Sequence, residues 1–86
     1  MLTKAFIIKN PSGLHARPAS LFVQKATSYP CNIHVIKGSK KVNGKSIMGL
    51  MTLGAAMGEE IILEIDGEGE QQAMEELGGL LETVHE

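Results

Sequence analysis

Short strand-like segments alternate with amphipathic helical segments along the whole of this 86-residue chain. Apolar residues at every second position predict a strand over 60–65. Apolar residues three and four positions apart predict a helix over 16–28. The inward-facing residues of these two segments are Ile61, Leu63 and Ile65 in the strand and Ala19, Phe22, Val23 and Ala26 in the helix. A chain of this length can bury only one modest core, so we expect a single domain over residues 1–86.

The same two periodicities predict the other elements of the chain. The expected strands are 2–9, 32–37 and 40–42, and the expected further helices are 47–53 and 70–84. Gly38 and Ser39 provide the turn between the two middle strands. The resulting order, β-α-β-β-α-β-α, predicts an α+β two-layer sandwich in which helices cover one face of an antiparallel or mixed sheet. Gly78 and Gly79 each cost a helix roughly 1 kcal/mol relative to Ala, so we expect its last turns to be the least stable.

A histidine stands just before the first predicted helix, in the segment Gly13-Leu14-His15-Ala16-Arg17-Pro18-Ala19. Pro18 is tolerated in a first turn, where backbone N–H groups have no partner within the helix. An anion at His15 would meet those donors, from the backbone in the region of Ala16, Arg17 and Pro18, where Pro18 itself has no N–H, and the positive end of the helix dipole. Arg17 adds a planar cation suited to phosphate oxygens.

These charges also favour the neutral imidazole of His15, whose ordinary pKa is about 6.5, because they disfavour its protonated form. A neutral imidazole is a nucleophile, and a phosphoryl group on it would be stabilised by the same donors. A lone histidine at a helix start more often serves as a cap or turn residue. Together with Arg17 and Pro18, it indicates a histidine that carries a phosphoryl group.

A second motif surrounds Ser46, which is a favourable N-cap for the short helix over 47–53. On that helix Met48 and Met51 are three residues apart and should share an exposed face, although peripheral core is the commoner place for such residues. Gly44-Lys45-Ser46 resembles the end of a nucleotide-binding P-loop. That loop needs a glycine at position 39, which is Ser39, so we reject this interpretation.

Composition excludes several classes of function. The net charge of -2 comes without a basic run that could follow a nucleic-acid backbone. Cys31 is the one cysteine, so an internal disulfide is impossible and a reducing compartment is expected. The apolar run at the amino terminus is too short for a signal peptide or a membrane span, which favours a cytoplasmic protein. The three histidines have no metal-site spacing, and we expect neither a metal nor a cofactor.

The two motifs and the order of elements resemble HPr, the histidine-containing phosphocarrier of the bacterial phosphoenolpyruvate-dependent sugar phosphotransferase system. The segment 13–19 is similar to the family's active-site motif, and Lys45-Ser46-Ile47-Met48-Gly49 is similar to the regulatory motif of its Gram-positive branch. The resemblance covers essentially the whole chain. It implies an open-faced β-sandwich, with a four-stranded antiparallel sheet and three helices packed on one face.

For function, the resemblance implies that His15 accepts a phosphoryl group on Nδ1 from phosphorylated enzyme I and passes it to sugar-specific enzyme IIA domains. It implies that Arg17 stabilises that group and that Ile47, Met48 and Met51 contribute to docking. It further implies that HPr kinase/phosphorylase phosphorylates Ser46 and that the product acts with the catabolite control protein. Such a protein is a carrier rather than an independent enzyme, and we expect a monomer with no direct contact to nucleic acid or membrane.

Two other interpretations remain. One is a regulatory paralogue of the Crh type, which would act only through phosphorylated Ser46. Proteins of that type lack the active-site histidine, so His15 argues against it. The other is a small ligand-sensing or interaction domain of the same architecture, which would have no use for His15, Arg17 and Pro18 together.

Overall fold

The computed structural model describes residues 1–11, 13 and 16–82, apart from the side chain of Ala16. The elements follow the predicted order: β1 (Leu2–Ile7), α1 (Ala16–Thr27), β2 (Asn32–Lys37), β3 (Lys40–Asn43), α2 (Ile47–Leu53), β4 (Glu60–Asp66) and α3 (Glu70–Glu82). The expected boundaries differ by one or two residues at four ends. Val84, predicted as the end of the last helix, lies outside the described residues.

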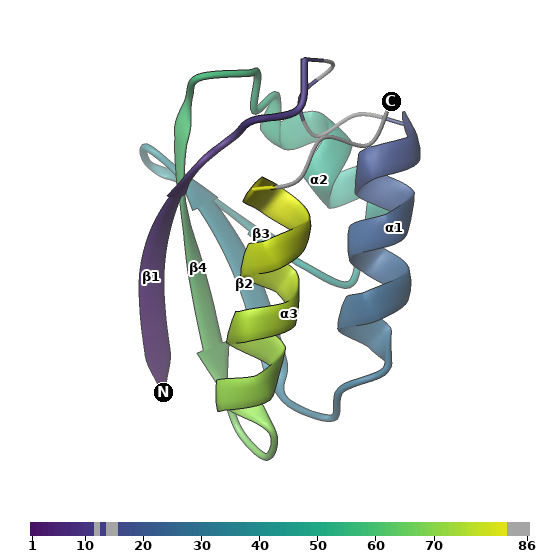
Figure 1. The fold of residues 1–86 in the computed structure, drawn as a ribbon, viewed down its shortest axis with the longest axis vertical. Coiled ribbons are helices and arrows are strands. Elements are labelled where there is room, and N and C mark those ends of the chain that lie inside the picture. Colours follow the sequence, from purple (N-terminus) through teal and green to yellow (C-terminus); the bar gives the residue numbers. More distant parts are fainter. Residues whose placement is uncertain (12, 14–15, 83–86) are drawn as a thin grey trace.

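All strand pairs in this part of the chain are antiparallel, in the order β1-β4-β2-β3. This resolves the choice between an antiparallel and a mixed sheet. The first strand pairs with the last, so that Leu2 lies opposite Ile65, and Ile33 lies opposite Ile65 on the other side. Figure 1 shows the helices together on one face of this sheet, with α1 and α3 running in opposite directions.

The core lies between the sheet and the helices, as the periodicities predicted. Ile61, Leu63 and Ile65 are completely buried on β4, because alternate side chains of a strand point to the same face. They form one core cluster with the buried residues of α1, Ala19, Phe22 and Ala26. Val23 of α1 and Leu80 of α3 are only partly buried and pack against this cluster. Cys31 is a free cysteine and is buried in the core like the apolar residues around it.

Gly78 is buried where α3 crosses β1, and the prediction for it was incomplete. A Cβ atom added at Gly78 would lie 2.6 Å from Cζ of Phe6, whereas one added at Gly79 would meet nothing within 4 Å. Gly78 therefore allows the ring of Phe6 to pack directly on the helix. The sequence indicated only the helical cost of this glycine and not the contact that requires it.

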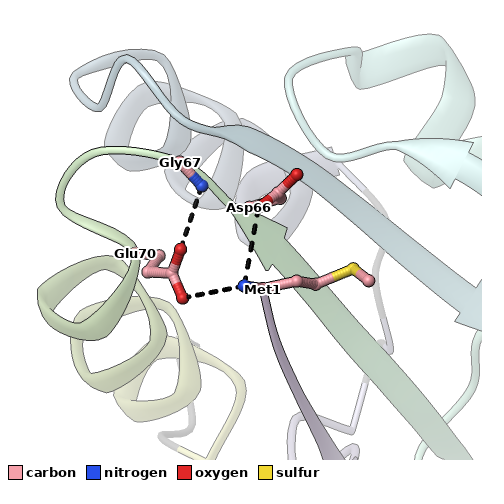
Figure 2. Close-up of polar contacts among 4 residues, drawn as sticks. All are labelled: Met1, Asp66, Gly67 and Glu70. Atoms are coloured by element: carbon pink, nitrogen blue, oxygen red, sulfur yellow. Dashed lines mark hydrogen bonds and ion pairs between the residues drawn. The ribbon is translucent and has the colours of Figure 1, made fainter.

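The amine of Met1, just before β1, contacts the end of β4 and the start of α3 (Figure 2). These contacts lie at the opposite end of the molecule from α2 (Figure 1). The ammonium group of Met1 lies 3.3 Å from Glu70 Oε2 and 3.5 Å from Asp66 Oδ1. The other carboxylate oxygen of Glu70 accepts a hydrogen bond from the Gly67 N–H at 3.1 Å. Because of these contacts, mainly the bond and charge of Glu70, the pKa of the terminal amine is raised. The pKa of Glu70 is lowered, first by the Gly67 N–H and then by the amine.

Candidate functional site

The turn before α1 is built around Asn10 and Gly13. The Gly13 N–H donates to the Asn10 carbonyl oxygen at 2.9 Å, and Asn10 Nδ2 donates to the Gly13 carbonyl oxygen at 3.4 Å. Asn10 is only 4% exposed, so its amide sits beneath the turn rather than in solvent. Gly13 has φ +68°, a conformation that glycine adopts at little cost. His15 itself lies outside the described residues, so its predicted role stays a prediction.

Helix α1 begins at Ala16, directly after His15 in the sequence. Its first turn contains no acidic residue that would offset the partial positive charge of the helix start. Pro18 is buried and Arg17 is exposed. Among the described residues the Arg17 guanidinium has no hydrogen bond or ion pair, so it is available to a phosphate.

A cavity adjoins Gly13 and Pro18, with a volume of about 10 Å³, room for roughly one water molecule. It is lined mainly by apolar side chains, among them Phe22 and Leu81. A cavity of this size cannot hold a small-molecule substrate.

Ser46 is the N-cap of α2, as predicted. It has an extended backbone, and its Oγ accepts a hydrogen bond from the Gly49 N–H at 3.1 Å. The preceding residue is also held, because Lys45 Nζ donates to the Tyr29 carbonyl oxygen at 2.7 Å. Gly54, with φ +70°, ends the helix.

The predicted docking residues of α2 are exposed. Ile47, Met48 and Met51 are 40%, 75% and 43% exposed, while Leu50 and Leu53 on the other side of the helix are buried. Met57, in the turn after α2, is also 57% exposed and was missed by the sequence analysis. Its apolar side chain between polar and small residues was the available signal. Figure 1 shows α2 and the start of α1 at the same end of the molecule, so the two motifs share a region.

Glu59 and Lys37 lie beside the turn that follows α2, and no spacing in the sequence united them. Glu59 Oε1 accepts a hydrogen bond from the Ala56 N–H at 2.8 Å and lies 3.0 Å from Lys37 Nζ. These contacts lower the pKa of Glu59, with the Ala56 N–H as the larger cause.

The described part of the chain contains no group of three or more His, Cys, Asp or Glu side chains placed to hold a metal ion. His34 is half-buried on β2, and His85 lies outside the described residues. Within residues 1–11, 13 and 16–82, no helix has the length and apolar character needed to cross a membrane.

Residues 2–83 match the family described as the PTS HPr component phosphorylation site. The chain belongs to the HPr family. Its similarity to the HPr-like protein Crh of Halalkalibacterium halodurans is 48% identity over 95% of the chain and 98% of that protein. Its similarity to the phosphocarrier protein HPr of Borreliella burgdorferi is 42% identity over the full length of both.

Solved structures give the same fold. A crystal structure of HPr-C-His from Thermoanaerobacter tengcongensis is similar with a TM-score of 0.92 and 48% identity, over 95% of this chain and 92% of that one. A structure of an HPr dimer from the same organism is similar with a TM-score of 0.76 and 48% identity, over 95% of this chain and 94% of that one. The open-faced sandwich expected for the family is thus confirmed, and the relatives include both HPr and Crh proteins.

Proposed function

We propose that this protein is a phosphocarrier that accepts a phosphoryl group on Nδ1 of His15 from phosphorylated enzyme I and transfers it to enzyme IIA domains. The observation that carries the proposal is the family match over residues 2–83, together with a histidine directly before a helix whose first turn has no acidic residue. In each transfer the bond from phosphorus to one protein's donor atom breaks as the bond to the next protein's nucleophile forms. The chain acts as a carrier, and its partners complete each active site.

The groups around His15 suit a phosphoryl group that must be released again. Arg17 and the first backbone N–H groups of α1 supply positive charge at the surface. A buried and fully coordinated phosphate would be held too tightly for onward transfer, because only interactions stronger in the transition state speed a reaction. Exposed Arg17 and a water-sized cavity fit this requirement.

We assign the docking of enzyme I and enzyme IIA to the exposed apolar side chains of α2 and the turn after it, namely Ile47, Met48, Met51 and Met57. Exposed apolar patches often mark protein interaction sites, and Met adapts to several partners. The carrier role would place the protein in the cytoplasm as one domain over residues 1–86. We expect it to act as a monomer, because it must present one face to successive partners; sedimentation of a dimer at micromolar concentration would contradict this.

The second motif supports regulation of the same surface through Ser46. A phosphate on Ser46 adds about -1.5 to -2 charges at pH 7, beside a helix start that favours negative charge. The fold should tolerate it, while the new charge lies next to Ile47 on the docking face. HPr kinase/phosphorylase would attach the phosphate, and the catabolite control protein would bind the product.

The test of the carrier role is incubation with enzyme I and phosphoenolpyruvate. We expect an acid-labile phosphate in the wild type, its loss in His15→Ala, and its retention in the control His34→Ala. Retention in His15→Ala would place the phosphate elsewhere, and a wild type that takes up none would refute the carrier role. Arg17→Ala should take up phosphate more slowly.

A regulatory protein of the Crh type is the second candidate, because a Crh protein is 48% identical to this chain. It predicts the opposite pattern: no phosphate from enzyme I, and an acid-stable phosphate from ATP and HPr kinase/phosphorylase that Ser46→Ala abolishes. Retention of the acid-stable phosphate in Ser46→Ala would refute the regulatory role of Ser46 in either candidate.

A further inference from the structure

One charged pair fixes the backbone segment 54–56 that follows α2. Lys37 Nζ, from the end of β2, donates to the Gly54 carbonyl oxygen at 2.9 Å and lies 3.0 Å from Glu59 Oε1. The same oxygen of Glu59 accepts the Ala56 N–H at 2.8 Å. The segment is thus held at its first residue by Lys37 and at its last by Glu59.

Gly13 rests directly on this segment. A Cβ atom at Gly13 would overlap the carbonyl oxygen of Ala55 and lie 3.0 Å from Cα of Ala56. Gly13 is itself buried and bonded to Asn10 in both directions. Because the two backbones touch without an intervening side chain, a displacement of 54–56 would move Gly13 or leave a gap beneath it.

In the sequence, His15 stands between two residues whose backbone the structure describes, Gly13 and Ala16. It follows Gly13 by two residues, a distance of at most about 7 Å along an extended chain. It directly precedes Ala16, where α1 begins. The position of Gly13 therefore sets one of the two described backbone points between which the chain contains His15.

We propose that Lys37 and Glu59 are positioning residues for phosphoryl transfer at His15, because they fix the 54–56 backbone on which Gly13 rests, two residues before His15 in the sequence. This inference depends on the carrier role proposed for His15. The pair acts through backbone geometry rather than through stability. Its side chains are 29% and 40% exposed, and ion pairs this accessible to water contribute little to the free energy of folding.

The chain offers a matched control. Lys41 Nζ lies 2.8 Å from Glu64 Oε1, and their side chains are 50% and 22% exposed. Glu64 alternates with the buried Leu63 and Ile65, so this pair lies on the face of the sheet that the helices leave open. It joins β3 to β4 and, among the described residues, makes no bond to segment 54–56. Its loss should therefore change the free energy of unfolding about as much as the loss of Lys37–Glu59, without changing the rate of phosphoryl transfer.

The test compares Lys37→Met and Glu59→Ala with the controls Lys41→Met and Glu64→Ala. Transfer from phosphorylated enzyme I is measured over a range of carrier concentrations, together with unfolding in urea. A 1 Å misplacement of a reacting group can cost about 100-fold in rate, so we expect the maximal rate of Lys37→Met and Glu59→Ala to fall roughly 3- to 10-fold. The concentration for half-maximal rate should change less. The maximal rate of Glu59→Gln should fall less, because its amide oxygen can still accept a hydrogen bond from the Ala56 N–H.

An NMR measurement on the same variants reports the position of the turn directly. The amide signal of Gly13 should shift in Lys37→Met and stay in place in Lys41→Met. Wild-type transfer rates in Lys37→Met and Glu59→Ala, or an equal loss in the control pair, would overturn the inference. A wild type without phosphate on His15 would instead refute the carrier role, and the Gly13 signal would still decide whether the charged pair positions the turn.

Discussion

At the scale of single residues, two adjacent glycines of α3 have opposite roles. Gly78 faces the ring of Phe6 with no room for a Cβ, whereas Gly79 faces open space. Both pay the same entropic cost of glycine in a helix. Only the contact with β1 distinguishes them.

We predict that Gly78→Ala destabilises the protein by up to about 2 kcal/mol, because the usual overpacking cost of about 1–3 kcal/mol outweighs the roughly 1 kcal/mol that alanine gains in a helix. Gly79→Ala, the matched control, should stabilise it by up to about 1 kcal/mol. Urea unfolding at neutral pH measures both. Two variants with the same sign of change would show that the Phe6 contact does not decide the effect.

The residues that sequence reasoning placed correctly were those whose role is local. Ser46 was predicted as an N-cap because its partner, the Gly49 N–H, lies three residues away. The partner of Gly78 is Phe6, at the other end of the chain, and Lys37 and Glu59 are joined only by the fold. Because these partners are far apart in the sequence, no hydrophobic periodicity indicates that they meet. The turn of Gly13 was recognised as a motif, but its contact with Ala55 required the structure.

At the scale of elements, α2 is a seven-residue helix that depends on its ends. A helix this short is marginal by itself, so packing of Leu50 and Leu53 and the cap at Ser46 must stabilise it. All seven elements were predicted, most from a hydrophobic period of their own and β3 from the Gly38-Ser39 turn that precedes it. The pairing of β2 with β3 was predicted from the turn between them and is confirmed. The pairing of β4 with β1 and β2 was not predicted, since it depends on which apolar faces meet.

We predict that Ser46→Ala lowers the free energy of unfolding by about 1 kcal/mol through loss of the bond to the Gly49 N–H. Ser46→Asp should stay close to the wild type, because aspartate is an equally good N-cap, yet it should slow transfer from enzyme I. Ser39→Ala, in the exposed turn between β2 and β3, is the control for stability. A Ser46→Ala variant as stable as Ser39→Ala would show that the cap contributes nothing.

At the scale of the whole molecule, charged contacts at the amino terminus make stability depend on pH in two directions. Glu70 has a lowered pKa, so its contribution is present above its ordinary value of 4.5 and is lost as the pH falls through the folded value. The Met1 amine has a raised pKa, so its contribution is present below its ordinary value of 8.0 and is lost as the pH rises through the folded value. Figure 2 shows that Glu70 takes part in both contributions, because it contacts the Gly67 N–H and the Met1 amine.

We therefore predict that Glu70→Gln reduces the loss of stability at both ends of the pH range, below about pH 4.5 and above about pH 8. Acetylation of the amine should reduce the alkaline loss and only part of the acid loss, because the Gly67 N–H still lowers the pKa of Glu70. Glu75→Gln, exposed on the same helix, is the control. Urea midpoints measured from pH 3 to pH 10 provide the comparison, and an unchanged alkaline limb in Glu70→Gln would contradict the assigned partner of the amine.

The pairing of β1 with β4 also has a consequence for the order of folding. It joins residues 2 and 65, whereas the pairing of β2 with β3 joins residues 37 and 40. Closing a loop about twentyfold longer costs roughly 3 kcal/mol more in chain entropy. The central hairpin can therefore form early, and the amino-terminal strand should join the sheet late. In native-state amide exchange, the amide hydrogens of β1 should exchange faster than those of β2. The strand nearest the amino terminus is then the last to join the sheet.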